Sequence, residues 1–312
     1  MNTVKQRHLP RTQPRKTNDD FEGPLLSVEN LTVRYGGSDS STQAVKGISF
    51  TVEKGETVAV VGESGSGKST AVLGSVGLIS CPPDGVTGRV TFQGIDLQSL
   101  SVPELNRIRG RDFGVVFQDA LGSPNPVLTV GEQVAEPLII HGLASKREAR
   151  ARAIELLDSV GIPDAAGRID DYPHQMSGGM RQRVMMATAL SCDPTLLIAD
   201  EPTTALDVTV QAEILALIKR ERQRRGMSVL IVSHDLGVVA GLADRVIVMY
   251  QGSIVEDADV DSLYRDPQHP YTRSLLDSIP KPDRPRRSHL EVPTKATIES
   301  WAAAPTPSKE IP

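Results

Sequence analysis

The segment at residues 62–69, GESGSGKS, constrains the fold more than any other part of this 312-residue chain. It fits the phosphate-loop pattern G-x-x-x-x-G-K-[ST], which is specific only where a strand precedes it and a helix follows it. Both flanks are present, because the apolar run TVAVV lies directly before it and a helical pattern starts at Lys68. Such glycines let several backbone N–H groups converge on phosphate oxygens at a helix N-terminus. The segment therefore predicts a nucleotide-binding domain, and a chance glycine-rich turn is the weaker interpretation.

This loop supplies the first group of predicted binding residues, with ATP and Mg²⁺ as the expected ligands. We expect Lys68 to neutralise the β- and γ-phosphates and the Ser69 hydroxyl to ligate Mg²⁺. The predicted nucleotide-binding residues of the loop are Gly62, Glu63, Ser64, Gly65, Ser66, Gly67, Lys68, Ser69 and Thr70.

Two consecutive carboxylates end a second apolar run, LLIADE at residues 196–201. A phosphate-loop fold holds its Mg²⁺ near an aspartate of this kind, so we predict Asp200 as a metal-site residue. Glu201 lies one residue further and is predicted to polarise the attacking water as a general base. The alternative is an acidic helix N-terminus before Pro202, since carboxylates are favourable there. The nearby phosphate loop makes this alternative the weaker one.

Composition excludes several other classes. The formal net charge is −5 and aromatic residues make up only 4% of the chain, so no nucleic-acid partner is expected. Two cysteines, Cys81 and Cys192, are too few for a disulfide framework and weakly suggest a reducing compartment. No secretory signal is recognisable, and no apolar run approaches the roughly 20 residues that span a bilayer. We therefore expect a soluble chain whose membrane role, if any, comes through a partner.

The order of predicted elements indicates an α/β fold with a mainly parallel sheet. Strands are expected at 26–35, 44–52 and 57–61, and short buried strands at 113–117, 196–199, 229–232 and 246–249. Helices are expected at 68–79, 130–141, 146–160, 179–191 and 209–223. We predict a flexible basic arm at 1–23, an ATPase domain at 24–265 with a helical subdomain at about 121–178, and a C-terminal extension with a Pro-rich tail at 266–312.

Two longer segments carry a family resemblance. YPHQMSGGMRQRVMMATAL and the following LLIADEPTTALDVTVQ strongly resemble the nucleotide-binding subunits of ABC transporters, within them the oligopeptide, dipeptide and nickel importers. The resemblance extends from about residue 25 to residue 280 and involves several motifs in the family's order. It implies the phosphate-loop NTPase core of ABC ATPases, an antiparallel β subdomain, an inserted helical subdomain and a short C-terminal extension.

The resemblance implies roles for three isolated residues. Tyr35 matches the aromatic residue that stacks on adenine, although a tyrosine at a strand end is more often a core residue. Gln118, in VVFQDA, matches the glutamine that contacts Mg²⁺ and the attacking water. His234, in IVSHD, matches the histidine that senses the γ-phosphate; alone it would be taken for a hydrogen-bonded histidine at a strand end.

The resemblance also implies residues that act across a dimer. Ser177, Gly178 and Gly179 match the signature that binds the γ-phosphate held by the opposite ATPase subunit. This role is physically reasonable because SGG before a helix offers a hydroxyl and free N–H groups to an anion. Asp207, in TALD, matches the loop that crosses the dimer interface.

The sequence departs from the family pattern at a few positions. Met176 replaces Leu at the start of the signature, and Met180 replaces Gln, which is usual in this branch; neither change suggests an inactive site. The residues Ala120, Leu121 and Gly122 differ from the usual ones near the membrane-subunit contact, so partner specificity is expected to differ. HPYTRSLLDSIP, at 269–280, matches the importers' C-terminal extension. No cysteine follows Cys192, so the iron–sulfur cluster of some relatives is not expected.

We therefore predict the ATPase subunit of an ABC importer of oligopeptides or dipeptides, with Lys68, Gln118, Glu201 and His234 as its catalytic residues. It would work at the cytoplasmic face of the membrane with two permease subunits, a second ATPase subunit (a heterodimer is favoured) and an extracytoplasmic substrate-binding protein. Nickel, glutathione or another small solute is the alternative cargo. A soluble ABC ATPase of DNA repair, translation or cofactor assembly is the alternative class; the absence of sustained heptads and of a second ATPase unit disfavours it. A binding module without catalysis is disfavoured by the intact acidic pair.

Overall fold

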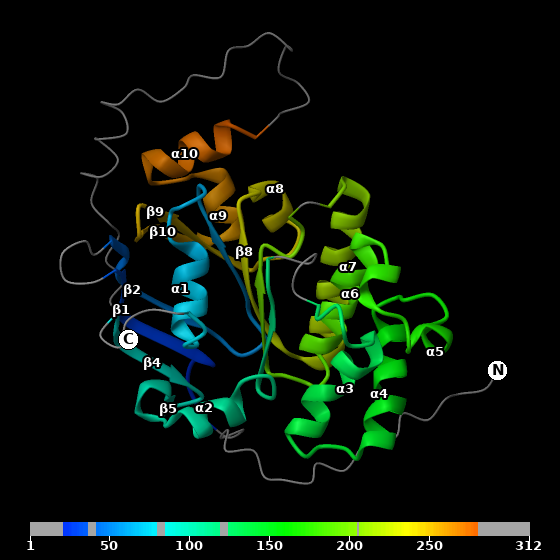
Figure 1. Cartoon of the computed structure of the whole chain (residues 1–312). Helices are drawn as coiled ribbons and strands as arrows, with labels where there is room; N and C mark the ends of the chain where they lie inside the picture. Colours follow the sequence, from blue (N-terminus) through cyan, green and yellow to red (C-terminus); the bar gives the residue numbers. More distant parts are fainter. Residues whose placement is uncertain (1–20, 37–41, 80–84, 119–123, 205, 280–312) are drawn as a thin grey trace.

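A computed structural model describes residues 21–36, 42–79, 85–118, 124–204 and 206–279. Within them the chain forms a six-stranded sheet beside a four-stranded sheet, with helices on both faces of the larger one (Figure 1). Most of the predicted N-terminal arm, the tail after residue 279 and the divergent residues Ala120, Leu121 and Gly122 lie outside the described residues.

The six-stranded sheet has the order β10-β9-β3-β8-β7-β6, and it is parallel except for the β9–β10 hairpin. Its core strand β3 is buried along its whole length, as expected for a short continuous apolar run between two neighbours. The strands are β3 (Thr57–Val61), β6 (Phe113–Val116), β7 (Leu196–Asp200), β8 (Ser228–Ser233), β9 (Arg245–Tyr250) and β10 (Ser253–Asp259).

The four-stranded sheet is antiparallel and has the order β2-β1-β4-β5. Its apolar face packs on the larger sheet and on α1, which gives the antiparallel β subdomain that the resemblance implied. The strands are β1 (Leu26–Tyr35), β2 (Thr42–Val52), β4 (Val86–Phe92) and β5 (Ile95–Asp96).

The helices divide between the two faces of the larger sheet. Alternate residues of β3 face opposite ways, with Val58 and Val60 in the core shared with α1, and Ala59 and Val61 in the core shared with α6 and α7. The helices are α1 (Lys68–Ser75), α2 (Val102–Ile108), α3 (Val130–Ile140), α4 (Lys146–Ser159), α5 (Ala165–Arg168), α6 (Gly178–Ala189), α7 (Val208–Arg225), α8 (Leu236–Val239), α9 (Val260–Arg265) and α10 (Pro270–Asp277), with short 3₁₀ turns at Leu97–Ser99 and Pro173–Gln175.

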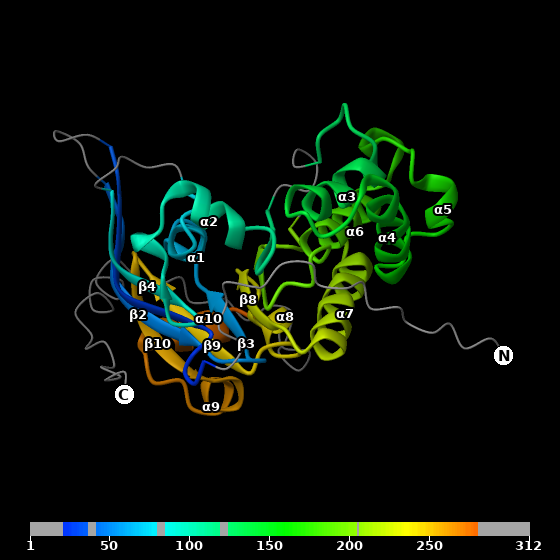
Figure 2. The same cartoon turned by 90° about the horizontal axis from the view of Figure 1, so that it is seen from below.

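Helices α3, α4 and α5 lie together at the end of the molecule opposite β1, β2 and β4 (Figures 1 and 2). Capping boxes fix where two of them begin: Thr129 pairs with Glu132 at α3, and Ser145 with Glu148 at α4. Residues 124–178 contain no strand, as the sequence analysis expected of an inserted helical segment. No helix among the described residues is long and apolar enough to cross a membrane.

Most predicted elements are present, and their ends differ by a few residues. The helix predicted at 68–79 ends at Ser75, because a turn follows in which Leu78 N–H donates to Leu73 O. The helix predicted at 209–223 is longer and includes Val208 and Arg225. The strands β4, β5 and β10 and the helices α2, α5, α8, α9 and α10 were not predicted individually.

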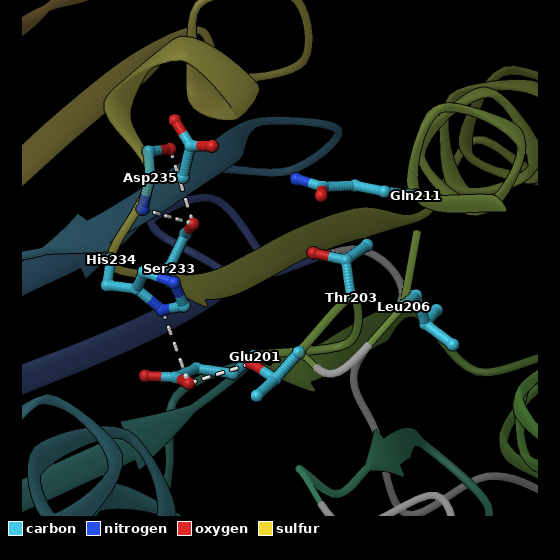
Figure 3. Close-up of a pocket in the computed structure, with 8 residues that line it drawn as sticks. Glu201, Thr203, Leu206, Gln211, Ser233, His234 and Asp235 are labelled. Carbon is cyan, nitrogen blue, oxygen red and sulfur yellow. Dashed lines mark hydrogen bonds and ion pairs between the residues drawn. The ribbon is translucent and has the colours of Figure 1, made fainter. Parts of the chain in front are cut away.

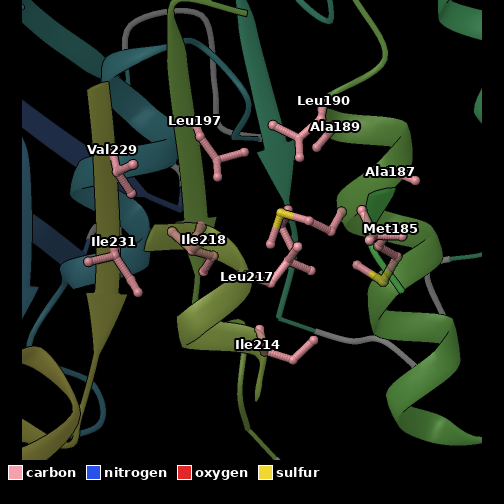
Figure 4. Close-up of a cluster of buried hydrophobic side chains, with 14 of the residues drawn as sticks. Met185, Ala187, Ala189, Leu190, Leu197, Ile214, Leu217, Ile218, Val229 and Ile231 are labelled. Carbon is pink, nitrogen blue, oxygen red and sulfur yellow. The ribbon is translucent and has the colours of Figure 1, made fainter. Parts of the chain in front are cut away.

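The core between the sheet, α6 and α7 supports the strand ends that carry the site (Figure 4). We expect Ile218→Ala, a change of a side chain with no exposed surface on α7, to lower the free energy of unfolding by about 2–5 kcal/mol. Urea denaturation would measure this. Val208→Ala, on the same helix but 83% exposed, is the matched control and should have little effect. Similar losses in both variants would contradict the assigned core.

Candidate active site

The phosphate loop lies at the carboxyl end of β3, the sheet edge where β7 and β8 also end. Two of its glycines leave no room for a side chain. A Cβ at Gly62 would lie 2.2 Å from Met249 O, and one at Gly67 would lie 2.5 Å from Ala44 O. Both glycines also have positive φ, 149° and 97°. The loop therefore takes its shape from close backbone contacts with β9 and with β2.

The ammonium of Lys68 is buried beneath the loop. Its Nζ donates hydrogen bonds of 2.8 Å to the carbonyl oxygens of Gly62 and Glu63. Burial lowers the pKa of Lys68, and the carboxylates of Glu201, Asp200 and Glu63 oppose this effect. A lysine ammonium has three N–H donors, so two carbonyls leave one for another acceptor.

Ser69 links the loop to the acidic end of β7. Its hydroxyl donates a 2.7 Å hydrogen bond to Oδ1 of Asp200. Burial raises the pKa of Asp200, and the Ser69 hydrogen bond and Lys68 act in the opposite direction. Two oxygen donors from separate elements thus meet beside the phosphate loop.

Glu201 is the centre of a converging group of side chains. Its Oε2 accepts hydrogen bonds of 2.9 Å from Gln118 Nε2 and from Thr204 Oγ1. The imidazole Nδ1 of His234 lies 3.4 Å from the same oxygen, and Figure 3 shows the ring facing the carboxylate. Glu201 has φ of 44°, a left-handed conformation held by its N–H donating to Val232 O on β8. Strained backbone of this kind is frequent at functional sites.

A cavity of about 190 Å³ opens beside Glu201. Figure 3 shows Gln211 and Thr203 across it from Ser233 and Asp235. Its lining residues come from the segment after β7, from α7 and from the end of β8, namely Glu201, Thr203, Thr204, Leu206, Gln211, Ser233, His234 and Asp235.

Tyr35 ends β1 close to the start of α1. Its hydroxyl lies 3.5 Å from Thr70 Oγ1, the last residue of the predicted loop set. The residue is partly exposed. The structure thus brings together Tyr35, the loop, Gln118, the acidic pair and His234.

The signature residues form a second group. Ser177 caps α6, its hydroxyl accepting the Met180 N–H at 3.3 Å, and it is exposed. Asp207 caps α7 by accepting the Val210 N–H at 3.0 Å, and a Cβ on Gly179 would lie 2.9 Å from Val210. The two caps are therefore neighbours. Since α6 and α1 pack on opposite faces of the sheet, the signature group is separate from the phosphate loop of its own chain (Figure 1).

Two further residues of the site were missed by the sequence analysis. Thr204 bonds to Glu201, and the buried Gln182 on α6 donates a 2.6 Å hydrogen bond from Nε2 to Pro202 O. Gln182 thus ties the signature helix to the segment after Glu201. The two threonines that follow Pro202 in EPTT were the available sequence signal for Thr204. No sequence signal was available for Gln182.

A phosphate loop after a central strand, with an acidic pair at a neighbouring strand end, defines a phosphate-loop ATPase. A family profile described as ABC transporter matches residues 45–204, and one described as oligopeptide/dipeptide transporter, C-terminal region, matches 255–303. The chain belongs to the ATP-binding proteins of ABC transporters, which are ATPases coupled to transport.

Individual relatives agree with this assignment. The oligopeptide transport ATP-binding protein OppD of Bacillus subtilis is 49% identical over 257 residues, which cover 82% of this chain and 72% of OppD. The glutathione import ATP-binding protein GsiA of Escherichia coli is 48% identical over 266 residues, 83% of this chain and 42% of GsiA. The ATP-binding cassette MJ0796, solved as a dimer with ADP and Pi, is 32% identical with a TM-score of 0.67, over 75% of this chain and 98% of that one.

Burial of the Asp200 carboxylate has a cost in stability that one substitution tests. Because the pKa of Asp200 is raised on folding, the folded state loses stability as pH rises from the unfolded pKa to the folded one. We expect Asp200→Asn to raise the melting temperature of the nucleotide-free protein at pH 7, by about 2–4 °C for each kcal/mol regained. The gain should shrink as pH falls below the raised pKa of the folded state, and it should be absent below about 4, the ordinary pKa of an aspartate in the unfolded chain. A gain that is independent of pH would contradict the assigned cause.

Proposed function

We propose that this chain powers an importer of oligopeptides or dipeptides by hydrolysing ATP between two ATPase subunits. The observation that carries the proposal is the convergence of Gln118, Thr204 and His234 on one oxygen of Glu201, beside a phosphate loop whose lysine retains an N–H donor. The names of the relatives support the cargo, since they are peptide and glutathione import proteins.

In this proposal the loop binds the phosphates of ATP. Backbone N–H groups of the loop cradle the phosphate oxygens at the start of α1. Lys68 neutralises the β- and γ-phosphates with its remaining N–H group. Tyr35 stacks on adenine, which agrees with its position beside Thr70.

Ser69, Asp200 and Gln118 would hold Mg²⁺ together with the phosphates. The donors fit this ion, because Mg²⁺ prefers oxygen ligands and is commonly held by one or two carboxylates plus substrate phosphates. The described residues contain no group of three or more His, Cys, Asp or Glu side chains that could hold a metal unaided. When bound, Mg²⁺ would supply charge neutralisation at the transferred phosphoryl group.

Glu201 is the general base in this mechanism. Its carboxylate accepts a proton from the attacking water, while Gln118 and Thr204 fix its orientation by hydrogen bonds to Oε2. His234 lies on the same side of the cavity and would contact the γ-phosphate. The chemistry requires positioning and charge neutralisation, and no covalent intermediate on the protein.

A second ATPase subunit would complete each site. Ser177, Gly178 and Gly179 of one subunit would bind the γ-phosphate held by the phosphate loop of the other, with Asp207 beside them in the interface. Support comes from the exposure of the two helix caps and from the dimeric state of MJ0796. We favour a heterodimer with a related chain.

The remaining partners follow from an import function. Two transmembrane permease subunits would receive the motion of the ATPase pair at the cytoplasmic face of the membrane, and an extracytoplasmic binding protein would deliver the cargo. We assign residues 24–265 to the ATPase domain, about 121–178 to its helical subdomain and 266–312 to the C-terminal extension. Glutathione is the alternative cargo that a specific relative favours, although this chain covers only 42% of GsiA.

Replacing Glu201 with Gln tests the catalytic assignment. The change keeps the shape of the side chain but removes the base, so we expect ATP binding to persist and the turnover number to fall by about 10²–10⁴-fold. Phosphate release at saturating ATP would measure it. Glu155→Gln changes an exposed carboxylate on α4 and should leave turnover unchanged. Substantial steady-state hydrolysis by Glu201→Gln would exclude Glu201 as the base.

Affinity capture tests the assembly. The Glu201→Gln chain would be captured from native membranes with ATP and Mg²⁺, and the co-purifying proteins identified by mass spectrometry. We expect two multi-span permease subunits and a second ATPase, and a binding protein whose bound solute identifies the cargo. Only soluble partners, recovered from membranes shown to be intact, would favour a soluble ABC ATPase instead.

A further inference from the structure

Helix α10 lies against the start of the phosphate loop, although some 200 residues of chain separate the two. Its second residue, Tyr271, is 1% exposed and packs on Tyr250 at the end of β9, with ring centroids 4.4 Å apart. The Tyr271 hydroxyl accepts a 2.8 Å hydrogen bond from the backbone N–H of Glu63. Burial raises the pKa of Tyr271, so the phenol keeps its proton.

The Glu63 N–H belongs to the same peptide group as the carbonyl of Gly62. That carbonyl is one of the two acceptors of the Lys68 ammonium, at 2.8 Å. In a trans peptide the N–H and the C=O point to opposite sides, so Tyr271 and Lys68 hold this one peptide group from its two sides.

We propose that Tyr271 is a positioning residue for nucleotide binding. By accepting the Glu63 N–H, its hydroxyl fixes the Gly62–Glu63 peptide with the carbonyl toward Lys68. This carbonyl in turn holds the Lys68 ammonium in the position in which it would bind the phosphates. This inference rests on the phosphate-binding role proposed for Lys68. It assigns to the C-terminal extension a direct part in the affinity of the ATPase for nucleotide.

The start of α10 is itself fixed to the larger sheet. Glu256 on β10 is 3% exposed, and its two carboxylate oxygens accept the backbone N–H groups of Gln268 and His269 at 2.7 and 3.0 Å. His269 in turn caps α10 by accepting the Tyr271 N–H at its Nδ1. The tyrosine is therefore presented to the loop by a rigid support and not by a flexible tail.

The test compares Tyr271→Phe with wild type as full-length chains. The variant keeps the ring and its packing but lacks the hydroxyl, so the Gly62–Glu63 peptide loses one of its two restraints. We expect the dissociation constants of both ATP and ADP, measured by equilibrium dialysis, to rise by about three- to tenfold. The melting temperature without nucleotide should fall by no more than the loss of one hydrogen bond produces, whereas a merely structural role would lower it without changing the affinity of the folded protein for nucleotide.

Tyr250→Phe is the matched control, because its ring packs on that of Tyr271 while its hydroxyl accepts a hydrogen bond from the side chain of Gln251. It should leave nucleotide affinity unchanged. The inference is overturned if Tyr271→Phe binds nucleotide like wild type, or if both variants weaken binding equally. These binding measurements need no transport or hydrolysis, so an inactive wild-type chain would count against the proposed function alone.

A second variant covers the case in which Tyr271→Phe does not fold. Glu256→Gln has one carboxamide oxygen in place of two carboxylate oxygens, so it can no longer offer a separate acceptor to each of the two N–H groups at the start of α10. We expect it to weaken ATP and ADP binding in the same direction, by about two- to fivefold. Unchanged affinity in Glu256→Gln would then overturn the inference.

Discussion

The buried ammonium of Lys68 is the charge on which the site depends. A cation out of water is unfavourable unless it has acceptors and opposite charges close by. Here two carbonyls of the phosphate loop supply the acceptors, and the carboxylate of Glu201, directly after β7, supplies the largest opposing charge. Loop, helix α1 and strand β7 must therefore keep their relative positions for the apoprotein to tolerate this lysine. The same requirement places them where a nucleotide needs them.

Much of the fold follows from patterns that are local in the sequence. The run at β3 and the apolar segments at β7 and β8 were predicted because buried parallel strands have continuous apolar sequences. By contrast, β4 was missed although its burial alternates along the strand, because Gly88 interrupts the apolar positions of this short segment and its stability comes from pairing with β1, more than fifty residues earlier. Such pairing leaves no local signal.

The residues of the site can be divided in the same way, into those that local sequence predicts and those that it does not. Motif residues such as Lys68, Asp200 and Glu201 were predicted because their chemistry requires particular residue types at a fixed spacing. Their roles remain proposals, whereas their proximity follows from the sheet. Residues that act through tertiary contacts were not predictable: Gln182 reaches a backbone carbonyl after β7, and Tyr271 reaches a backbone N–H from the far end of the chain. Nothing in their own neighbourhoods distinguishes them from ordinary helix residues.

The packing of α1 and α6 on opposite faces of one sheet has a genetic consequence. If each nucleotide lies between two subunits, as proposed, the loop of one chain and the signature of its partner serve the same ATP. A mutation in the loop of one subunit and a mutation in the signature of its partner would then inactivate the same site and leave the other site intact. The same two mutations in one chain would inactivate both sites. In a heterodimer, the loss of function would therefore depend on how the mutations are distributed between the two genes and not on their number.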